Sequence, residues 1–109
     1  MINWARINEL RDEIGAEDFG EVVELFLGEV EERLDTLSAE KPALDTKDDM
    51  HFLKGSALNL GFVHLAALCS DYEQRAGDGE ILTEIMTVKE TFAASKIEFL
   101  SNLETEAAA

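Results

Sequence analysis

The chain has 109 residues, the size of one domain, and 46% of them are hydrophobic, so it can bury a core without a metal or disulfide. Its formal net charge of -15, from 24 acidic and 9 basic side chains, disfavours binding to nucleic acid or to an anionic membrane. The N-terminus has no apolar run of signal-peptide length, and no segment is long enough to cross a bilayer, so we expect a cytoplasmic protein.

Apolar residues recur at helical spacing in five segments of the chain. The first segment ends at Gly15, and its stripe comprises Trp4, Ile7, Leu10 and Ile14. The second runs from about Glu17 to Glu40 and ends before Pro42, because proline has no backbone N–H and restricts the residue before it. Its apolar stripe lies opposite a face crowded with Glu and Asp and comprises Phe19, Val23, Phe26, Val30, Leu34 and Leu37.

The third segment begins with a pattern that resembles a capping box, since Asp49 follows Thr46 by three residues. This pattern predicts a helix from about Lys47 that ends near Gly61. The fourth predicted helix stops at residues 77–79, and its stripe comprises Leu65, Leu68, Cys69 and Tyr72. The fifth is expected from about residue 80 to residue 104.

A short helix followed by four longer ones predicts an all-α fold, an antiparallel four-helix bundle with a short N-terminal capping helix. Residues 1–109 form one domain in this interpretation, with residues 105–109 frayed. The start at Met1 and the complete bundle favour a free-standing protein over a segment of a larger kinase. We expect a monomer. The lone Cys69 cannot form an internal disulfide, and its apolar neighbours predict a small buried side chain rather than a nucleophile.

His51, Lys54 and Gly55 share one face of the third predicted helix, away from the core stripe of Leu53, Ala57 and Leu60. Side chains three or four positions apart on a helix are neighbours, with Cβ atoms about 5–6 Å apart. Near neutral pH an exposed histidine is partly uncharged, and the free lone pair of the neutral ring can attack phosphorus. The face therefore suits a histidine that accepts a phosphoryl group beside a cation.

Lys54 and Gly55 each allow two interpretations. Lys54 can face phosphate, or it can be a surface lysine paired with Asp48, Asp49 or Glu73. Glycine inside a helix costs about 0.5–1 kcal/mol relative to alanine, so Gly55 needs a reason. That reason is either open space for an approaching partner or the close packing of a neighbouring helix.

The run HFLKGSALNLGF, from His51 to Phe62, resembles the signature of histidine-containing phosphotransfer (HPt) domains, whose pattern is H-x-L-K-G-S-x-x-x-L-G. All seven specified positions match: His51, Leu53, Lys54, Gly55, Ser56, Leu60 and Gly61. The resemblance implies a four-helix bundle in which Nε2 of His51 takes the phosphoryl group. It also implies that Lys54 positions phosphate and that Gly55 leaves room for a partner. In such a relay, Leu58 and Phe62 would give the docking surface apolar area.

Family members often carry Glu or Gln on the next helix, 22 residues after the histidine, and that position is Glu73 here. A carboxylate that accepts a hydrogen bond from Nδ1–H would fix the tautomer and leave Nε2 free. The expected partners are receiver domains or a hybrid histidine kinase, which pass phosphate to and from this chain. The alternative is a helical binding module that regulates such a partner by occupancy alone.

Other chemistries find no support in the sequence. There is no Gly-rich phosphate loop and no kinase signature, so we expect no autonomous kinase activity and no cofactor. Asp48 and His51 have the acidic-x-x-His spacing of di-iron bundles, but a second such pair is missing, so we expect no metal. The second histidine, His64, is expected at the surface or at a helix start.

Overall fold

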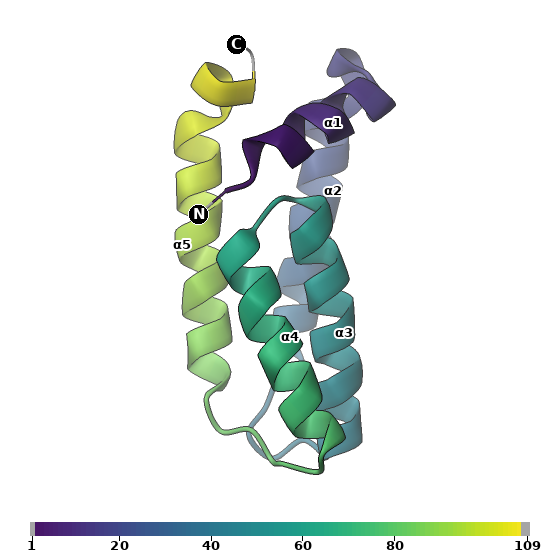
Figure 1. Ribbon diagram of the computed structural model, residues 1–109, viewed down its shortest axis with the longest axis vertical. Coiled ribbons are helices and arrows are strands. Elements are labelled where there is room, and N and C mark those ends of the chain that lie inside the picture. The colour runs from purple at the N-terminus through teal and green to yellow at the C-terminus, as the bar shows by residue number, and fades with distance from the viewer. Residues whose placement is uncertain (1, 108–109) are drawn as a thin grey trace.

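The computed structural model consists of five α-helices joined by short connections (Figure 1). It describes the backbone of residues 2–107 and the side chains of residues 2–103. In chain order the helices are α1 (Trp4–Ile14), α2 (Ala16–Asp35), α3 (Ala43–Asn59), α4 (Val63–Gly77) and α5 (Ile85–Ala107). Within this described part, the one isolated β-type pairing is an antiparallel bridge between Ile2 and Phe62. The prediction of an all-helical fold is therefore confirmed.

The four long helices run along the long axis of the molecule, and α1 lies across one end of them (Figure 1). Helix α1 contacts α2, α3 and α5, so it closes that end of the bundle, as expected of a capping helix. An aromatic cluster forms the centre of this end. Phe99 of α5 stacks on Trp4 at 5.9 Å between ring centroids and meets Phe62 edge-on at 5.7 Å. Because such rings carry large apolar areas, the cluster fixes α1 and the α3–α4 turn against α5.

Helix α3 begins earlier than the sequence pattern predicts, and α2 ends earlier. Helix α2 stops at Asp35 rather than near Glu40, and α3 begins at Ala43, directly after Pro42. Pro42 is the N-cap: with φ -56° and ψ 145° it is not helical itself, but its carbonyl accepts from the N–H of Thr46 at 3.1 Å, which starts the helical hydrogen bonds. Thr46 therefore lies inside the helix and is buried, so the predicted capping box is wrong.

Helix α5 begins at Ile85, not near residue 80, because the preceding segment is held by α4. The guanidinium of Arg75, near the end of α4, pairs with Glu80 and also with Glu84 at 3.3 Å. Leu82 between these two acids is buried, so residues 80–84 pack as a non-helical connection. The backbone is helical through Ala107, and the last two of the residues expected to fray, 108–109, lie outside the described part.

No helix within the described residues is long and apolar enough to cross a membrane.

Candidate functional site

His51 lies on the solvent-facing side of α3, near its middle. Its side chain is 71% exposed, whereas Leu53 and Ala57 of the same helix are fully buried. The face predicted from the apolar spacing is therefore the observed one, and the imidazole is open to an approaching protein.

The ring of His51 is oriented by a carboxylate from the neighbouring helix. Nδ1 of His51 lies 3.0 Å from Oε2 of Glu73 on α4. Since a carboxylate can only accept a hydrogen bond, Nδ1 carries the proton and donates a hydrogen bond to Glu73. The neutral ring then has its lone pair on Nε2, which is the atom available for attack on phosphorus.

Glu73 also pairs with Lys54. The Lys54 Nζ atom lies 2.7 Å from Oε1 of Glu73, an oxygen that is itself buried. The pKa of Glu73 is lowered, chiefly by the paired ammonium of Lys54 and further by His51, while burial opposes the shift. Glu73 is therefore a carboxylate at neutral pH, and both His51 and Lys54 contact it. Of the partners considered for Lys54, the structure selects Glu73.

Gly55 faces open space. A Cβ atom built on Gly55 would meet no atom within 4 Å, so close packing of another helix does not explain this glycine. The residue is exposed one turn after His51. Its contribution is a stretch of backbone without a side chain beside the imidazole, which leaves space for another molecule.

A shallow depression adjoins this glycine between α2 and α3. It is lined by Phe26, Glu29, His51, Phe52, Gly55, Ser56 and Asn59. Leu58 is 58% exposed on the same helix, as the docking interpretation requires. Phe62 is fully buried in the aromatic cluster, so the expectation that it belongs to the docking surface is wrong. The reason is that its ring packs against Phe92 and Phe99 of α5, at 6.1 and 5.7 Å between ring centroids, while its backbone pairs with Ile2.

Comparison with known proteins agrees with this geometry. The family model described as "Hpt domain" matches residues 21–108, which is most of the chain. The chain belongs to the Hpt domain family. It is 32% identical over 91 residues to phosphorelay protein LuxU of Vibrio vulnificus strain YJ016, covering 81% of this chain and 79% of the relative. It is 33% identical over 84 residues to phosphorelay protein LuxU of Vibrio cholerae, covering 74% of each. No solved structure matches at the same stringency.

The family match begins at residue 21, so it does not include α1. Two hydrogen bonds connect α1 and the residue before it to the C-terminal end of α3. Asn3, just before α1, donates its backbone N–H to the carbonyl of Gly61 at 2.7 Å. Arg6 of α1 donates to the side chain of Asn59 at 3.2 Å, and Asn59 lines the depression beside His51. The capping helix and the residue before it thus hold the C-terminal end of α3, the helix in which His51 lies.

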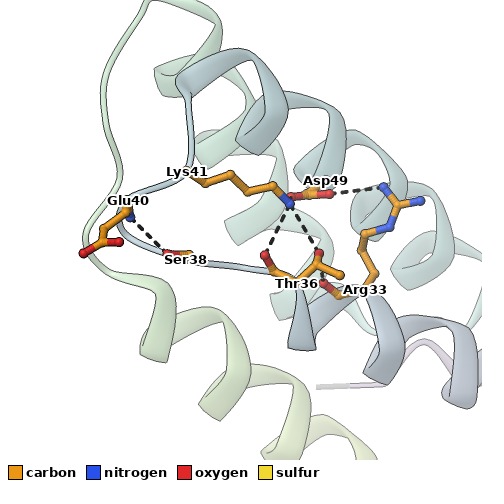
Figure 2. A network of polar contacts seen from close by, with 6 residues as sticks. All are labelled: Arg33, Thr36, Ser38, Glu40, Lys41 and Asp49. Carbon is orange, nitrogen blue, oxygen red and sulfur yellow. Dashed lines mark hydrogen bonds and ion pairs between the residues drawn. The ribbon is translucent and has the colours of Figure 1, made fainter.

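A buried charge cluster, which the sequence pattern misassigns, holds the other end of α3 (Figure 2). Asp49 is only 4% exposed, and its carboxylate accepts from Lys41 Nζ at 2.5 Å and from Arg33 Nη1 at 3.1 Å. Lys41 also donates to the carbonyl of Thr36 at 3.3 Å, which ties the α2–α3 connection to α3. The guanidinium of Arg33 lies 4.3 Å from the ring centroid of Phe52, the residue after His51.

The signal that identifies this cluster was present in the sequence. Asp49 lies four residues before Leu53 and three after Thr46, so it falls on the buried face of α3. An acid on an apolar stripe requires a charged partner, because a lone buried carboxylate is very costly. The capping interpretation of Thr46 and Asp49 concealed this requirement.

The remaining candidate groups take no part in this site. Cys69 is buried, and burial together with the charge of Glu73 raises the pKa of its thiol to about 12, so it is no nucleophile. His64 is exposed in the first turn of α4, as expected. Among the described residues, no group of three or more His, Cys, Asp or Glu side chains could hold a metal ion.

Proposed function

We propose that this chain relays a phosphoryl group through Nε2 of His51, between receiver-domain aspartates or from a histidine kinase to a receiver. The observation that carries the proposal is the exposed ring whose Nδ1–H is held 3.0 Å from Glu73. Histidine phosphotransfer is the chemistry of the Hpt family to which the chain belongs. The relatives named as phosphorelay proteins support a place in a two-component relay.

The transfer step needs little beyond this arrangement. The lone pair of Nε2 attacks the phosphorus of a receiver's aspartyl phosphate, and the bond from phosphorus to the aspartate oxygen breaks as the carboxylate leaves. Nδ1 keeps its proton, so the phosphorylated ring gains positive charge, which Glu73 balances at 3.0 Å. Because the product P–N bond is reactive, the same path runs in reverse to a second receiver.

Each of the other predicted site residues has a role in this scheme. Glu73 orients the ring, and Lys54, held against Glu73 at 2.7 Å, places a positive charge beside the transferred group. Gly55 leaves room for the partner, because nothing lies within 4 Å of the Cβ that a larger residue would have. Phosphate is supplied by another protein, since the chain has no phosphate-binding loop. The monomeric state and cytoplasmic location stay predictions.

The test is label transfer from a phosphorylated receiver. The wild-type chain should gain an acid-labile, alkali-stable phosphoryl group, and His51→Gln should gain none. His64→Gln is the matched control, because His64 is the second exposed histidine and lies outside the site. Labelling of His51→Gln at the wild-type level would refute the proposal.

A further inference from the structure

Lys47 is an exposed lysine one turn before His51, and it has no part in the transfer step proposed for His51. On a helix, residues four positions apart are stacked neighbours. Helical side chains also lean toward the N-terminal end, so the ring of His51 extends over the turn that contains Lys47. Lys54 lies on the opposite side of His51, three residues on. The imidazole is therefore flanked by a lysine on each side along α3.

The two lysines differ in whether their charge is balanced. Lys54 is in an ion pair with Glu73 at 2.7 Å. Within the described residues, Lys47 makes no hydrogen bond and no ion pair, although it lines the same hollow between α3 and α4 as Lys54 and Glu73. It is a positive charge without a fixed partner in a chain of net charge -15.

The aliphatic stem of Lys47 is supported by α4. A Cβ atom built on Gly77 would lie 3.6 Å from Cδ and Cε of Lys47, so the stem passes over the bare backbone of this glycine. Burying the stem of a lysine while its ammonium stays in water is a common arrangement. Here it keeps the charge in the α3–α4 hollow that Lys54 and Glu73 also line.

Once His51 is phosphorylated, the charges of the site do not balance. A phosphoryl group brings roughly two negative charges. The protonated ring and Lys54 are positive, but Glu73 offsets one of them. The group of His51, Lys54, Glu73 and phosphate is therefore left with excess negative charge, and Lys47 is the lysine one turn away that can offset it.

We propose that Lys47 is a second phosphoryl-binding cation of this chain, which attracts the incoming phosphoryl group and holds it on His51 together with Lys54. This inference rests on the proposed function, because it presumes that His51 is phosphorylated. It differs from a docking role in that Lys47 acts on the phosphoryl group itself, whichever molecule delivers it.

Phosphoramidate separates these two roles, because it phosphorylates histidine without any partner protein. Nε2 attacks its phosphorus, the P–N bond of the reagent breaks, and ammonia leaves with the bonding electron pair. Rates of His51 labelling are measured with phosphoramidate and with a phosphorylated receiver, for wild type, Lys47→Gln and Lys47→Arg. The matched control is Lys89→Gln, which removes the same charge from α5, where Lys89 lines a groove with α2.

Lys47→Gln should slow labelling by about 2- to 5-fold with both donors, as expected for one exposed charge acting at short range. Lys47→Arg should keep the wild-type rate, as should Lys89→Gln. The difference between Lys47→Gln and wild type should shrink as salt is added. Circular dichroism should give the same helix content for all variants, since Lys47 makes no polar contact within the described residues.

Three outcomes would overturn the inference. A Lys47→Gln rate that falls with the receiver but not with phosphoramidate would make Lys47 a docking residue only. An unchanged rate with both donors would leave it no role in the transfer. An equal loss in Lys89→Gln would reduce the effect to overall charge. In each case wild type is still labelled at His51, whereas failure of the proposed function would show as a labelled His51→Gln.

Discussion

Glu73 Oε2 lies 3.0 Å from Nδ1 of His51, so a residue of α4 sets the tautomer of a histidine on α3. The same carboxylate holds Lys54 at 2.7 Å. One side chain thereby contacts both the imidazole of the proposed acceptor and the neighbouring cation. Both contacts cross the α3–α4 boundary, so the site depends on how these two helices pack.

Replacing Glu73 should therefore slow transfer without removing the acceptor. Glu73→Ala leaves Nδ1 without an oriented acceptor, and loss of such a supporting contact typically costs about 10-fold or more in activity. Glu73→Gln keeps an amide oxygen that can accept from Nδ1–H, so it should retain a larger share of the rate. The measurement is the initial rate of label transfer from a phosphorylated receiver. Equal rates for Glu73→Ala and wild type would show that the ring needs no orienting partner.

The lowered pKa of Glu73 predicts a pH dependence of stability. A carboxyl whose pKa is lower in the folded chain than its ordinary value of 4.5 binds fewer protons when folded. It therefore stabilises the fold above that ordinary value, and the contribution disappears as pH falls through the lowered pKa. The difference in unfolding free energy between wild type and Glu73→Gln should be constant at neutral pH and shrink below pH 4.5. Urea titrations across this range measure it, and a difference that grows on acidification would contradict the assignment.

Gly55→Ala should separate folding from transfer. A methyl group at Gly55 meets nothing within 4 Å, so the substitution should raise helix stability by about 0.5–1 kcal/mol. Transfer from a receiver should fall, and Gly55→Gln should lower it further, because the added side chain occupies the space beside His51. Labelling with phosphoramidate, a small reagent, should change much less.

Gly20→Ala is the matched control for this substitution. Gly20 also lies inside a helix, and a Cβ there meets nothing within 4 Å, but it belongs to α2 near the α1 end. It should be stabilised to a similar degree while transfer is unchanged. If Gly55→Ala transferred phosphate at the wild-type rate, steric access at Gly55 would not matter.

The Asp49 cluster should contribute to stability rather than to the chemistry. Asp49→Asn removes the charge that Lys41 and Arg33 share, and loss of charged hydrogen bonds of this kind costs about 1–3 kcal/mol. Asp48→Asn is the control. Asp48 is exposed, so its substitution should change the unfolding free energy by no more than about 0.5 kcal/mol. Urea unfolding measures both. Similar values for the two variants would mean that the buried network contributes little.

The sequence predicted the helical stripes and the exposed face of α3 because both follow from local periodicity. His51, Lys54 and Gly55 are fixed relative to one another by one helix, and the family spacing located Glu73 on the next. The features that were missed depend on side-chain contacts between different elements. Residues 80–84 are held by Arg75, and Asp49 by Lys41 and Arg33, and neither set of partners follows from spacing along one helix.

The burial of Phe62 also could not be predicted from local sequence. The relay interpretation suggested a docking surface at this residue, yet its ring packs against Phe92 and Phe99 of α5, its backbone pairs with Ile2, and the side chain is fully buried. Which stretch of chain covers the α3–α4 turn is a tertiary choice. The sequence offered one hint, since Gly61 beside it matches the motif and a glycine can adopt the backbone angles of a tight turn.

Gly61→Ala should reveal how closely the N-terminal segment clamps this turn. Gly61 has φ +69°, and a Cβ there would lie 2.7 Å from the carbonyl oxygen of Asn3. The substitution should cost about 1–3 kcal/mol for the backbone conformation and more for the displaced segment. Gly79→Ala is the control, because its φ is +92° but a Cβ meets nothing within 4 Å, so it incurs the conformational cost alone.

Thermal and urea unfolding of the two glycine variants should rank Gly61→Ala as the less stable. Amide hydrogen exchange should also show faster exchange at Asn3, whose N–H donates to the Gly61 carbonyl at 2.7 Å. Equal losses of stability in the two variants, with the Asn3 amide still protected from exchange, would mean that the segment before α1 adjusts to the added methyl group without destabilising the fold. In that event α1 would cap the bundle through its apolar face, and the α3 end that carries Asn59 would not depend on the pairing of Asn3 with Gly61.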